Sequence, residues 1–405
     1  MSGLDPAQTV TAQRVAGWLR PAWVEVDLSA VTANVAHIRT MVAPSAVCAV
    51  VKAYGYGHGA VPVARAALAG GAGYLGVALA EEGHELRQAG IQVPVLVLSE
   101  PPAEAMALVV EDNLTATIYT EDGLAALLDA AAAARPVRPG PDGRGDGGPP
   151  VPVHLKLDTG MHRVGATPAM VVELARRVAA HPALRLEGLF THLAIADEPD
   201  DPFTAEQLDR FERVVRALAG EGIHPLMLHA ANSAGALCHP RSRYQMVRPG
   251  MAMYGQAPAA ALQGVPLVAP LQPALSFKAR VSYVKEVDAG ESLSYGLHYR
   301  LSRRSVVATV PVGYADGVPR RLFIVGGEVL IGGRRRPVVG AVTMDQLLVD
   351  CGGGSGVRAG DEVVLLGRQG DAEISPWEWA ERLGTIAYEV TCALSPRLPR
   401  LYTSH

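Results

Sequence analysis

The chain has 405 residues, of which 49% are hydrophobic and 19% are charged, and its formal net charge is −4. This length suits two domains rather than one, and the hydrophobic content is sufficient for large buried cores. A nearly balanced charge without a long run of Lys or Arg argues against a nucleic-acid partner or an anionic membrane surface.

The sequence also bears on location and on metals. It contains no uninterrupted apolar stretch long enough to span a bilayer, and its first twenty residues lack the apolar core of a signal peptide. The four cysteines are scattered and form no CxxC pair, so neither a zinc site nor a disulfide framework is indicated. We therefore expect a soluble cytoplasmic protein without a metal and without a membrane partner.

From about residue 22 to 250, apolar strand-like runs alternate with amphipathic helical patterns. The strand-like runs are 23–28, 47–51, 74–79, 93–98, 115–119, 151–157, 184–193, 226–229 and 245–251. The helical patterns between them include 29–41, 81–88, 121–134, 168–180 and 205–218, with Ser29 and Thr167 placed as caps. This order predicts a parallel sheet, and eight such strands close a (β/α)₈ barrel within about 250 residues. Nine runs are one too many, so either the first or the last lies outside the barrel.

The remaining chain differs in character. Residues 135–150 are rich in Pro, Gly and Asp and predict a flexible loop that tolerates deletion. After about residue 265, short alternating runs separated by glycine-rich turns predict a smaller β-domain, with a short helix at 376–383. The predicted organisation is a tail at 1–21, a barrel at 22–265 and a mainly β-domain at 266–405.

The most informative feature is Lys52, which ends the apolar run 47–51 and precedes a glycine-rich turn and an alanine-rich helical stretch at 60–69. A lysine at the carboxyl end of a parallel strand would face the crevice where α/β proteins bind ligands. Desolvation there lowers a lysine's pKa and frees the amine as a nucleophile or Schiff-base former. The alternative is a lysine that extends to the surface at a strand end.

Other polar residues occur at predicted strand ends, and a barrel would bring them to one face. They are Lys52, Lys156, Arg163, His192, His229 and Arg248. Backbone N–H groups near Ser233 and Gly250 could hold a phosphate. A lysine, a phosphate cradle and an arginine together suggest pyridoxal phosphate.

Each residue alone has a simpler explanation. His192 and His229 could be core histidines with satisfied hydrogen bonds, and Arg248 could be a structural ion-pair partner. Tyr295, in the predicted β-domain, could be an ordinary sheet tyrosine. The joint pattern is much harder to explain by accident.

The chain resembles alanine racemase, a pyridoxal-phosphate-dependent family of fold type III with a (β/α)₈ barrel and a C-terminal β-domain. The resemblance runs from about Trp23 to Tyr402. It rests on motifs at 49–59, 154–165, 191–192, 229–234, 246–254, 294–296, 313–317, 343–346 and 388–400. In this family the N-terminal strand joins the β-domain, which favours leaving 23–28 out of the barrel.

The resemblance implies a role for each matching residue. Lys52 and Tyr295 correspond to the two catalytic acid/base groups, and Lys52 also to the lysine that binds the cofactor. The positions that match cofactor contacts are Tyr56, His192, Asn232, Ser233, Arg248, Gly250, Met251 and Tyr388. Arg163 and Met344 match contacts to the substrate carboxylate. Supporting positions are Lys156, which is carbamylated in some members, His229, Tyr314 and Asp345.

The sequence departs from the family pattern at three places, so the resemblance does not determine the width and polarity of the substrate entrance. The segment 135–150 has the character of an insertion. Tyr54-Gly55 stands where smaller or more polar residues are frequent, His162 replaces a frequent glycine, and Thr343 replaces a frequent cysteine.

The implied activity is interconversion of L- and D-alanine in a homodimer, with Tyr295 and Met344 supplied by the partner subunit and D-alanine passing to peptidoglycan. Lys52 would act on the D-face and Tyr295 on the L-face of the α-carbon. Three alternatives remain: a racemase for serine or several amino acids, a non-enzymatic pyridoxal-phosphate-binding protein, and a related decarboxylase. Tyr295 and Met344 argue against the second, and Arg248 argues against the third because decarboxylases place an acid at the pyridine nitrogen.

Overall fold

The computed structural model describes residues 20–134 and 149–404, which form two compact units. One unit is Leu28–Ala274, and the other combines the segment up to Asp27 with the residues from Leu275 onward. In the described part of the chain, no helix has both the length and the apolar character needed to cross a membrane.

The first unit is built on eight short parallel strands. They form two runs, with the orders β4-β3-β2-β9 and β5-β6-β7-β8. A parallel bridge between Leu96 and Thr115 joins β4 to β5, and a hydrogen bond of 3.1 Å from Gln245 N to Leu228 O links β9 to β8. The ring is therefore closed, as the repeated βα pattern predicted. The strands are β2 (Ala46–Val50), β3 (Tyr74–Val77), β4 (Val95–Val97), β5 (Ala116–Ile118), β6 (Val151–Lys156), β7 (Leu184–Phe190), β8 (Met227–His229) and β9 (Met246–Val247).

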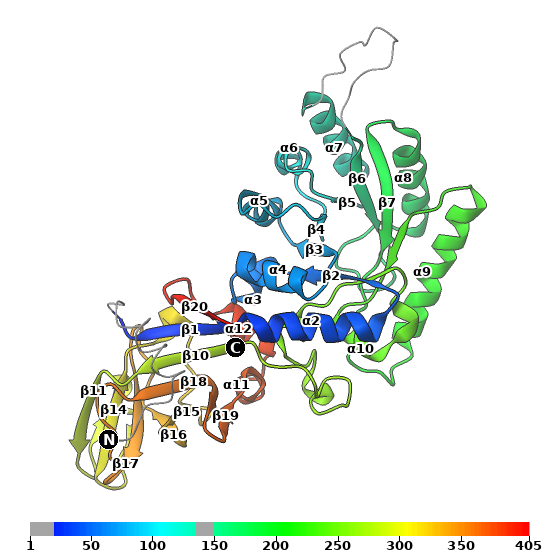
Figure 1. The fold of residues 1–405 in the computed structure, drawn as a ribbon. Helices are drawn as coiled ribbons and strands as arrows, with labels where there is room; N and C mark the ends of the chain where they lie inside the picture. Colours follow the sequence, from blue (N-terminus) through cyan, green and yellow to red (C-terminus); the bar gives the residue numbers. More distant parts are fainter. Residues whose placement is uncertain (1–19, 135–148, 405) are drawn as a thin grey trace. The chain divides into compact units, whose positions relative to one another are not determined.

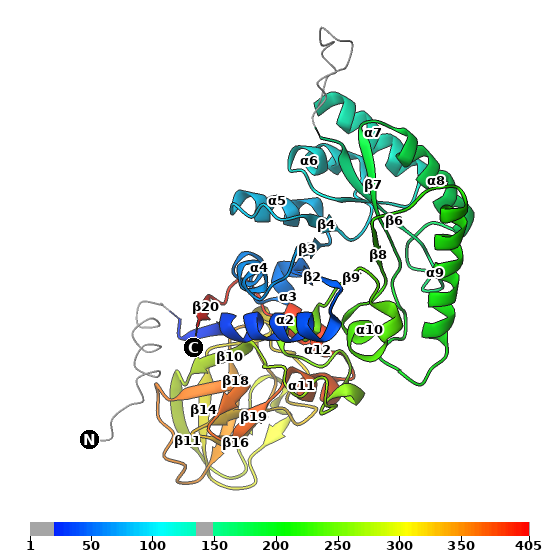
Figure 2. The ribbon, with the colours of Figure 1, turned by 45° about the vertical axis from the view of Figure 1, so that its right-hand side comes forward.

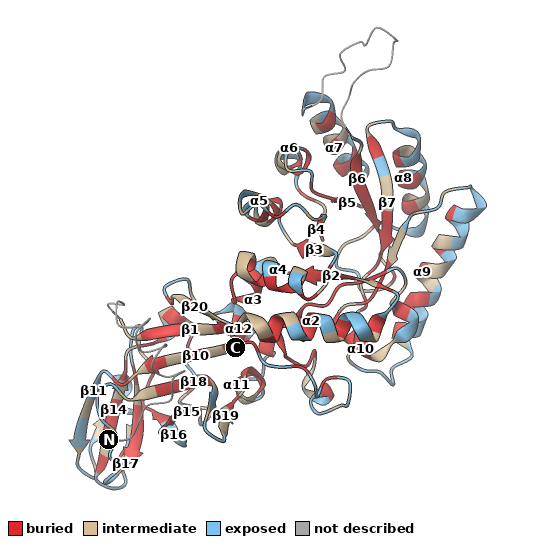
Figure 3. Cartoon of the chain, viewed as in Figure 1, coloured by how far each residue is buried: buried red, intermediate tan, exposed pale blue. Residues whose placement is uncertain are grey.

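Helices follow the strands and lie outside them, as Figures 1 and 2 show. Strand β6 is buried along its whole length, whereas the outer helices bury one face and expose the other (Figure 3). The helices are α2 (Leu28–Val42), α3 (Lys52–Tyr56), α4 (Ala60–Ala69), α5 (Ala80–Gln88), α6 (Met106–Glu111), α7 (Glu121–Ala134), α8 (Pro168–Ala180), α9 (Phe203–Gly220) and α10 (Ser233–Cys238). Short 3₁₀ turns occur at η1 (Ala103–Ala105), η2 (Pro240–Ser242), η3 (Met251–Tyr254) and η4 (Ala260–Leu262).

Local signals predicted some boundaries and missed others. Thr167 caps α8 as predicted, because its side chain accepts a hydrogen bond from Met170 N at 3.3 Å. Ser29 does not cap α2, because that helix already begins at Leu28. The predicted strand 245–251 shortens to β9, since Pro249-Gly250 leaves the ladder and η3 follows.

The segment 266–274 belongs to the barrel unit, although the sequence boundary placed it in the β-domain. Asn34 on α2 fixes it: Nδ2 donates to Gln272 O and Oδ1 accepts from Gln272 N, each at 2.8 Å. Such a pairing between residues far apart in the chain leaves no signal in local composition.

The second unit is dominated by one large mixed sheet with the order β11-β14-β17-β16-β15-β18-β10-β1-β20. The run 23–28 appears here as β1, which pairs antiparallel with β10 and parallel with β20. The strands are β1 (Ala22–Asp27), β10 (Leu275–Arg280), β11 (Tyr283–Val287), β14 (Ser305–Val310), β15 (Glu328–Ile331), β16 (Arg334–Val339), β17 (Leu347–Gly352), β18 (Glu362–Gln369) and β20 (Arg400–Thr403), with β19 (Ala372–Ile374) beside β18. A separate pair is formed by β12 (Ser292–Leu293) and β13 (Tyr299–Arg300), and the turns η5 (Tyr295–Leu297) and η6 (Tyr314–Asp316) and the helices α11 (Pro376–Leu383) and α12 (Ala387–Cys392) complete the unit.

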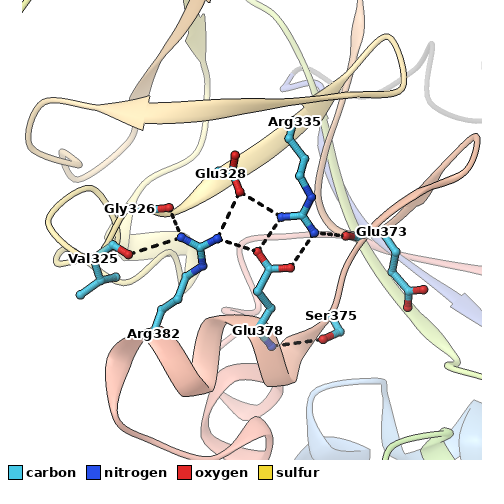
Figure 4. Close-up of polar contacts among 8 residues, drawn as sticks. All are labelled: Val325, Gly326, Glu328, Arg335, Glu373, Ser375, Glu378 and Arg382. Atoms are coloured by element: carbon cyan, nitrogen blue, oxygen red, sulfur yellow. Dashed lines mark hydrogen bonds and ion pairs between the residues drawn. The ribbon is translucent and has the colours of Figure 1, made fainter. Parts of the chain in front are cut away.

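A four-residue ion-pair network attaches α11 to this sheet (Figure 4). Arg335 on β16 contacts Glu378 on α11 at 2.7 Å and Glu328 on β15 at 3.0 Å. Arg382 on α11 reaches the same two carboxylates at 3.2 and 3.1 Å. The shared contacts hold the pKa of Glu378 below its usual range, chiefly through the hydrogen bonds from Arg335. The hairpin and the helix are therefore held as one body.

Two predicted features lie wholly or largely outside the described residues. They are most of the tail at 1–21 and the loop at 135–150, of which only the final two residues are described.

Candidate active site

Polar side chains converge at the carboxyl ends of the barrel strands. Lys52 is separated from the end of β2 by Val51 alone, Lys156 ends β6, and His229 ends β8. Arg248 directly follows β9. The positive charges of Arg248, Arg163 and Lys52 all act on Lys156, so the barrel brings these predicted site residues within electrostatic reach of one another.

A small pocket opens at the ends of β6 and β7. It is lined by Lys156, Asp158, Met161, Arg163, Thr191 and His192, among others. Arg163 is exposed on the loop after β6, whereas Lys156 is buried. Asp158 holds that loop, since its Oδ1 accepts from Gly160 N at 2.9 Å and from His162 N at 3.1 Å. The pocket thus contains two basic side chains and a carboxylate that fixes the loop after β6.

Arg248 is the centre of the buried polar network. It is 3% exposed, and its guanidinium donates to Thr191 O at 2.8 Å and to Ala230 O at 3.1 Å. Burial lowers its pKa to about 10, so it remains charged near neutrality. Its other contacts are His229 Nδ1 at 2.6 Å and His192 Nδ1 at 3.3 Å. A guanidinium only donates hydrogen bonds, so Arg248 orients the carbonyl and imidazole acceptors that surround it.

The donors of Arg248 set the protonation of two buried histidines. Because Arg248 donates to His229 Nδ1, His229 carries its proton on Nε2. His229 Nε2 then donates to His154 Nδ1 at 2.8 Å, so His154 carries its proton on Nε2, which faces Glu187 Oε2 at 3.9 Å. Both rings are neutral: burial and the charge of Arg248 lower the pKa of His154 to about 3 and that of His229 well below its usual value.

Two residues of β7 make this arrangement possible. A side chain at Gly188 would place its Cβ 2.6 Å from the His154 ring, so only glycine lets that ring lie across β7. Phe190 stacks on the His229 ring with centroids 4.6 Å apart. The same phenyl ring lies 5.2 Å from Lys156 Nζ and 5.2 Å from Arg248 Cζ, and so provides a face for both cations.

Lys156 lies among cations. Its Nζ donates to Leu98 O at 2.9 Å, and burial together with Arg248, Arg163 and Lys52 lowers its pKa to about 7. A substantial fraction of this amine is therefore neutral and nucleophilic near neutral pH. The same environment lowers the pKa of His192 well below its usual value.

A second group of predicted residues forms a compact backbone cradle. Ser233 Oγ accepts from Gly250 N at 3.0 Å and from Ala252 N at 3.3 Å. A Cβ at Gly250 would lie 2.5 Å from the Tyr56 hydroxyl, so glycine allows that hydroxyl to reach the backbone. Met251 is fully buried in η3, and Asn232 caps α10 by accepting from Gly235 N at 2.9 Å.

The remaining predicted residues belong to the second unit. Tyr295 starts η5 and is 74% exposed, and Met344 is 53% exposed. Tyr314 N donates to Thr343 O at 3.0 Å and Ala315 N donates to Met344 O at 3.1 Å, so the two segments are joined through their backbones. Asp345 is paired with Arg397 at 2.7 Å, and Tyr388 lies on α12. These side chains lie at the surface of the unit, on segments held by backbone hydrogen bonds and by the ion pair of Asp345 with Arg397.

Sequence reasoning assigned no role to His154, Gly188 or Phe190. The one available signal was a histidine inside a continuous apolar run at 151–157, which is unusual for a strand buried on both faces.

The structure combines a closed (β/α)₈ barrel, a lysine after its first strand, a buried arginine after its last and an appended β-domain, which is the combination expected of a barrel-type amino-acid racemase. Comparison with known proteins agrees with this class. Residues 26–258 match the model of the alanine racemase N-terminal domain, and residues 274–402 match that of the alanine racemase C-terminal domain.

Individual relatives match over nearly the whole chain. The chain is 48% identical to an alanine racemase of Symbiobacterium thermophilum, over 95% of this chain and 97% of the relative. A crystal structure of alanine racemase from Streptomyces lavendulae superimposes with a TM-score of 0.87 at 38% identity, covering 96% of this chain and 98% of that one. The enzyme from E. faecalis gives 0.86 at 39% identity, covering 96% and 99%. The chain belongs to the alanine racemase family.

Proposed function

We propose that Lys52 and Tyr295 are the two acid/base groups with which this chain interconverts L-alanine and D-alanine. The observation that carries the proposal is the position of Lys52 at the end of the first barrel strand, beside a buried cluster centred on Arg248. As a member of the alanine racemase family, the chain is a racemase that supplies D-alanine for peptidoglycan.

The cofactor of the proposal is pyridoxal phosphate, and the residues present fit it. The Ser233 and Tyr56 hydroxyls of the cradle could each donate to a phosphate, and the absence of a side chain at Gly250 leaves the Tyr56 hydroxyl its place. Met251, Asn232 and Tyr388 complete the proposed cofactor contacts, with His192 beside the ring. When bound, pyridoxal phosphate supplies a covalent attachment for the amino acid and withdraws electrons from its α-carbon.

Arg248 is the proposed partner of the ring nitrogen. A guanidinium donates a hydrogen bond without giving up its proton, so Arg248 would leave that nitrogen unprotonated. The bound cofactor would then withdraw electrons less strongly, which would favour racemisation over transamination. His229 holds Arg248 from behind, with its own proton directed to His154.

Racemisation requires a proton to leave one face of the α-carbon and another to arrive on the opposite face. In the proposal Lys52 exchanges the proton on the D-face and Tyr295 exchanges it on the L-face. Arg163 and the backbone at Met344 bind the substrate carboxylate, while Tyr314 and Asp345 support these segments. The low pKa of Lys156 supports its carbamylation, since a neutral amine can add CO₂ and the resulting anion would lie among cations.

The functional unit of the proposal is a cytoplasmic homodimer in which each subunit contributes Tyr295 and Met344 to its partner's site. Supporting it, both side chains are more than half exposed in the single chain, as is Leu297 beside Tyr295, at 65%. Large exposed apolar side chains grouped on one segment are typical of an interface.

The test is incubation of the purified protein with L-alanine, and separately with L-serine, in deuterated water. Fast formation of D-alanine with α-deuterium uptake and slow reaction of serine would support the proposal. Tyr295→Phe should abolish turnover while the cofactor remains bound, with Tyr283→Phe, an exposed β-domain tyrosine, as the matched control. Unchanged racemisation by Tyr295→Phe, or equal rates with serine, would contradict it.

A further inference from the structure

The segment after Lys52 has an unusual backbone. Five consecutive residues, from Ala53 to Gly57, have positive φ, with values of 52°, 54°, 60°, 53° and 85°. Hydrogen bonds from Gly55 N to Val51 O at 2.9 Å and from Gly57 N to Ala53 O at 3.1 Å close the turns. The chain therefore makes a left-handed helical turn immediately after the lysine.

Such a turn is unfavourable for most of the residues that form it. Ala53, Tyr54 and Tyr56 are not glycine, and L-residues in the left-handed region bring Cβ close to the following carbonyl oxygen. Packing secures the end of the turn, where Tyr56 and Gly57 are buried. It does not secure the beginning, where Ala53 is exposed and Tyr54 is 46% exposed. The residue next to Lys52 needs another restraint.

Glu82, on the first turn of α5, provides it. One carboxylate oxygen accepts from Ala53 N at 2.6 Å. The other accepts from Ala78 N at 2.7 Å and from Leu79 N at 3.2 Å. A single side chain thus joins the start of the left-handed turn to the backbone that connects β3 with α5, through short hydrogen bonds to a charged group.

We propose that Glu82 is a positioning residue for Lys52, holding the left-handed turn so that the lysine side chain stays directed into the barrel mouth. This inference rests on the proposed role of Lys52. Glu82 holds the turn because its two carboxylate oxygens both accept hydrogen bonds, one from Ala53 N and the other from Ala78 N and Leu79 N. Glutamine has one carbonyl oxygen and one amide nitrogen that only donates, so it keeps one end of the bridge and loses the other.

The first measurement is amide hydrogen exchange over residues 51–59 in the cofactor-free protein. This measurement does not depend on catalysis. Glu82→Ala should speed exchange at Ala53 and along the turn, and Glu82→Gln should do so less. Glu81→Ala is the matched control, because Glu81 is the exposed neighbour on the same helical turn. If Glu82→Ala does not fold, the glutamine variant and its control still provide the comparison.

The second measurement is the kinetics of alanine racemisation by the holoenzyme. A lysine displaced by about 1 Å should lower kcat by about 10- to 100-fold, with a smaller change in KM. Adding Ala53→Gly to Glu82→Ala should recover part of the lost kcat, because glycine adopts positive φ without strain. Loss of the α5 cap, which Glu82 forms by accepting from Leu79 N, would not be relieved by a substitution at position 53.

Unchanged exchange at Ala53 in Glu82→Ala, an equal effect of Glu81→Ala, or no rescue by Ala53→Gly would each overturn the inference. Failure of the proposed function has a different signature. If the Lys52→Ala variant still racemises alanine, Lys52 is not a catalytic residue, and this conclusion does not depend on the hydrogen exchange at Ala53.

Discussion

Gly250 is the residue at which a missing side chain matters most to the cofactor cradle. Its backbone N–H donates to Ser233 Oγ at 3.0 Å, and the Tyr56 hydroxyl occupies the space that a Cβ would need. Its φ of −106° is combined with a ψ of −94°, which lies outside the main regions for L-residues, so glycine provides backbone freedom here as well as space.

We expect Gly250→Ala to weaken cofactor binding. The added methyl group would lie 2.5 Å from the Tyr56 hydroxyl and force the ring or the backbone to move. Overpacking of this kind costs about 1–3 kcal/mol, which corresponds to about a 5- to 150-fold rise in the Kd for pyridoxal phosphate. Fluorescence titration of the cofactor-free protein with pyridoxal phosphate measures this Kd.

The control is Gly73→Ala, because a Cβ at Gly73 meets nothing within 4 Å. Equal affinity for both alanine variants would mean that Tyr56 and Gly250 do not form the phosphate cradle.

At the scale of elements, β6, β7 and β8 carry a buried chain of hydrogen bonds. Arg248, His229 and His154 follow one another across the barrel, and the β7 residue Gly188 gives the His154 ring its space. Each member fixes the hydrogen-bonding direction of the next, so the orientation of Arg248, which follows β9, depends on a ring three strands away, on β6.

This buried series of hydrogen bonds predicts that the folded state loses stability in acid. His154 has a pKa of about 3 in the folded protein and about 6.5 when unfolded, so the unfolded state binds more protons between these values. The free energy of unfolding therefore falls as the pH falls through this window, by about 1.4 kcal/mol per pH unit for each histidine held neutral. Urea unfolding of the cofactor-free protein at several pH values measures the slope.

His154→Gln should reduce that slope by about one proton, because glutamine keeps an acceptor for His229 but does not titrate in this range. His224→Gln, at an exposed position, is the control for loss of a histidine as such. An unaltered slope in His154→Gln would show that His154 is not held neutral.

The sequence predicted elements better than it predicted the contacts between them. The helix 168–180 matches α8 residue for residue because Thr167 and Pro168 mark its start, and 121–134 and 376–383 match α7 and α11 equally well. The parallel barrel followed from periodicity, and the choice of its eight strands among nine runs followed from the family resemblance. Residues at the strand ends were identified as candidate site residues because their polar side chains interrupt apolar runs.

What the sequence could not predict depends on register and on backbone handedness. The partnership of His154 with His229 requires that β7 lie between their strands and place a glycine opposite His154, which no local pattern encodes. A glycine-rich turn after Lys52 was predictable, but its left-handed path through Ala53 and Tyr54 was not, because these residues disfavour it. The restraint comes from Glu82, far along the chain.

At the scale of the whole molecule, the proposed sharing of active sites predicts complementation between inactive variants. Lys52→Ala and Tyr295→Phe should each be inactive alone. After mixing and subunit exchange at equal amounts, half of the dimers would be heterodimers, each with one intact site, giving about a quarter of the wild-type activity per site. The measurement is racemisation after reversible dissociation and reassociation.

The control mixture contains the Lys52→Ala variant and the Lys52→Ala/Tyr295→Phe double variant. No pair of subunits in this mixture has an intact site, because Lys52 is absent from both. Absence of recovery in the first mixture, with dimers demonstrably exchanged, would place Tyr295 in the site of its own chain.

The left-handed turn after Lys52 also limits which sequences this segment can adopt during evolution. Positions 53 and 54 face solvent, where substitutions are normally tolerated, yet their φ values exclude β-branched side chains. In a library of random variants, Gly and Asn should survive at these two positions while Val, Ile and Thr are lost. A site that looks permissive from its exposure is thus restricted by the shape of its backbone.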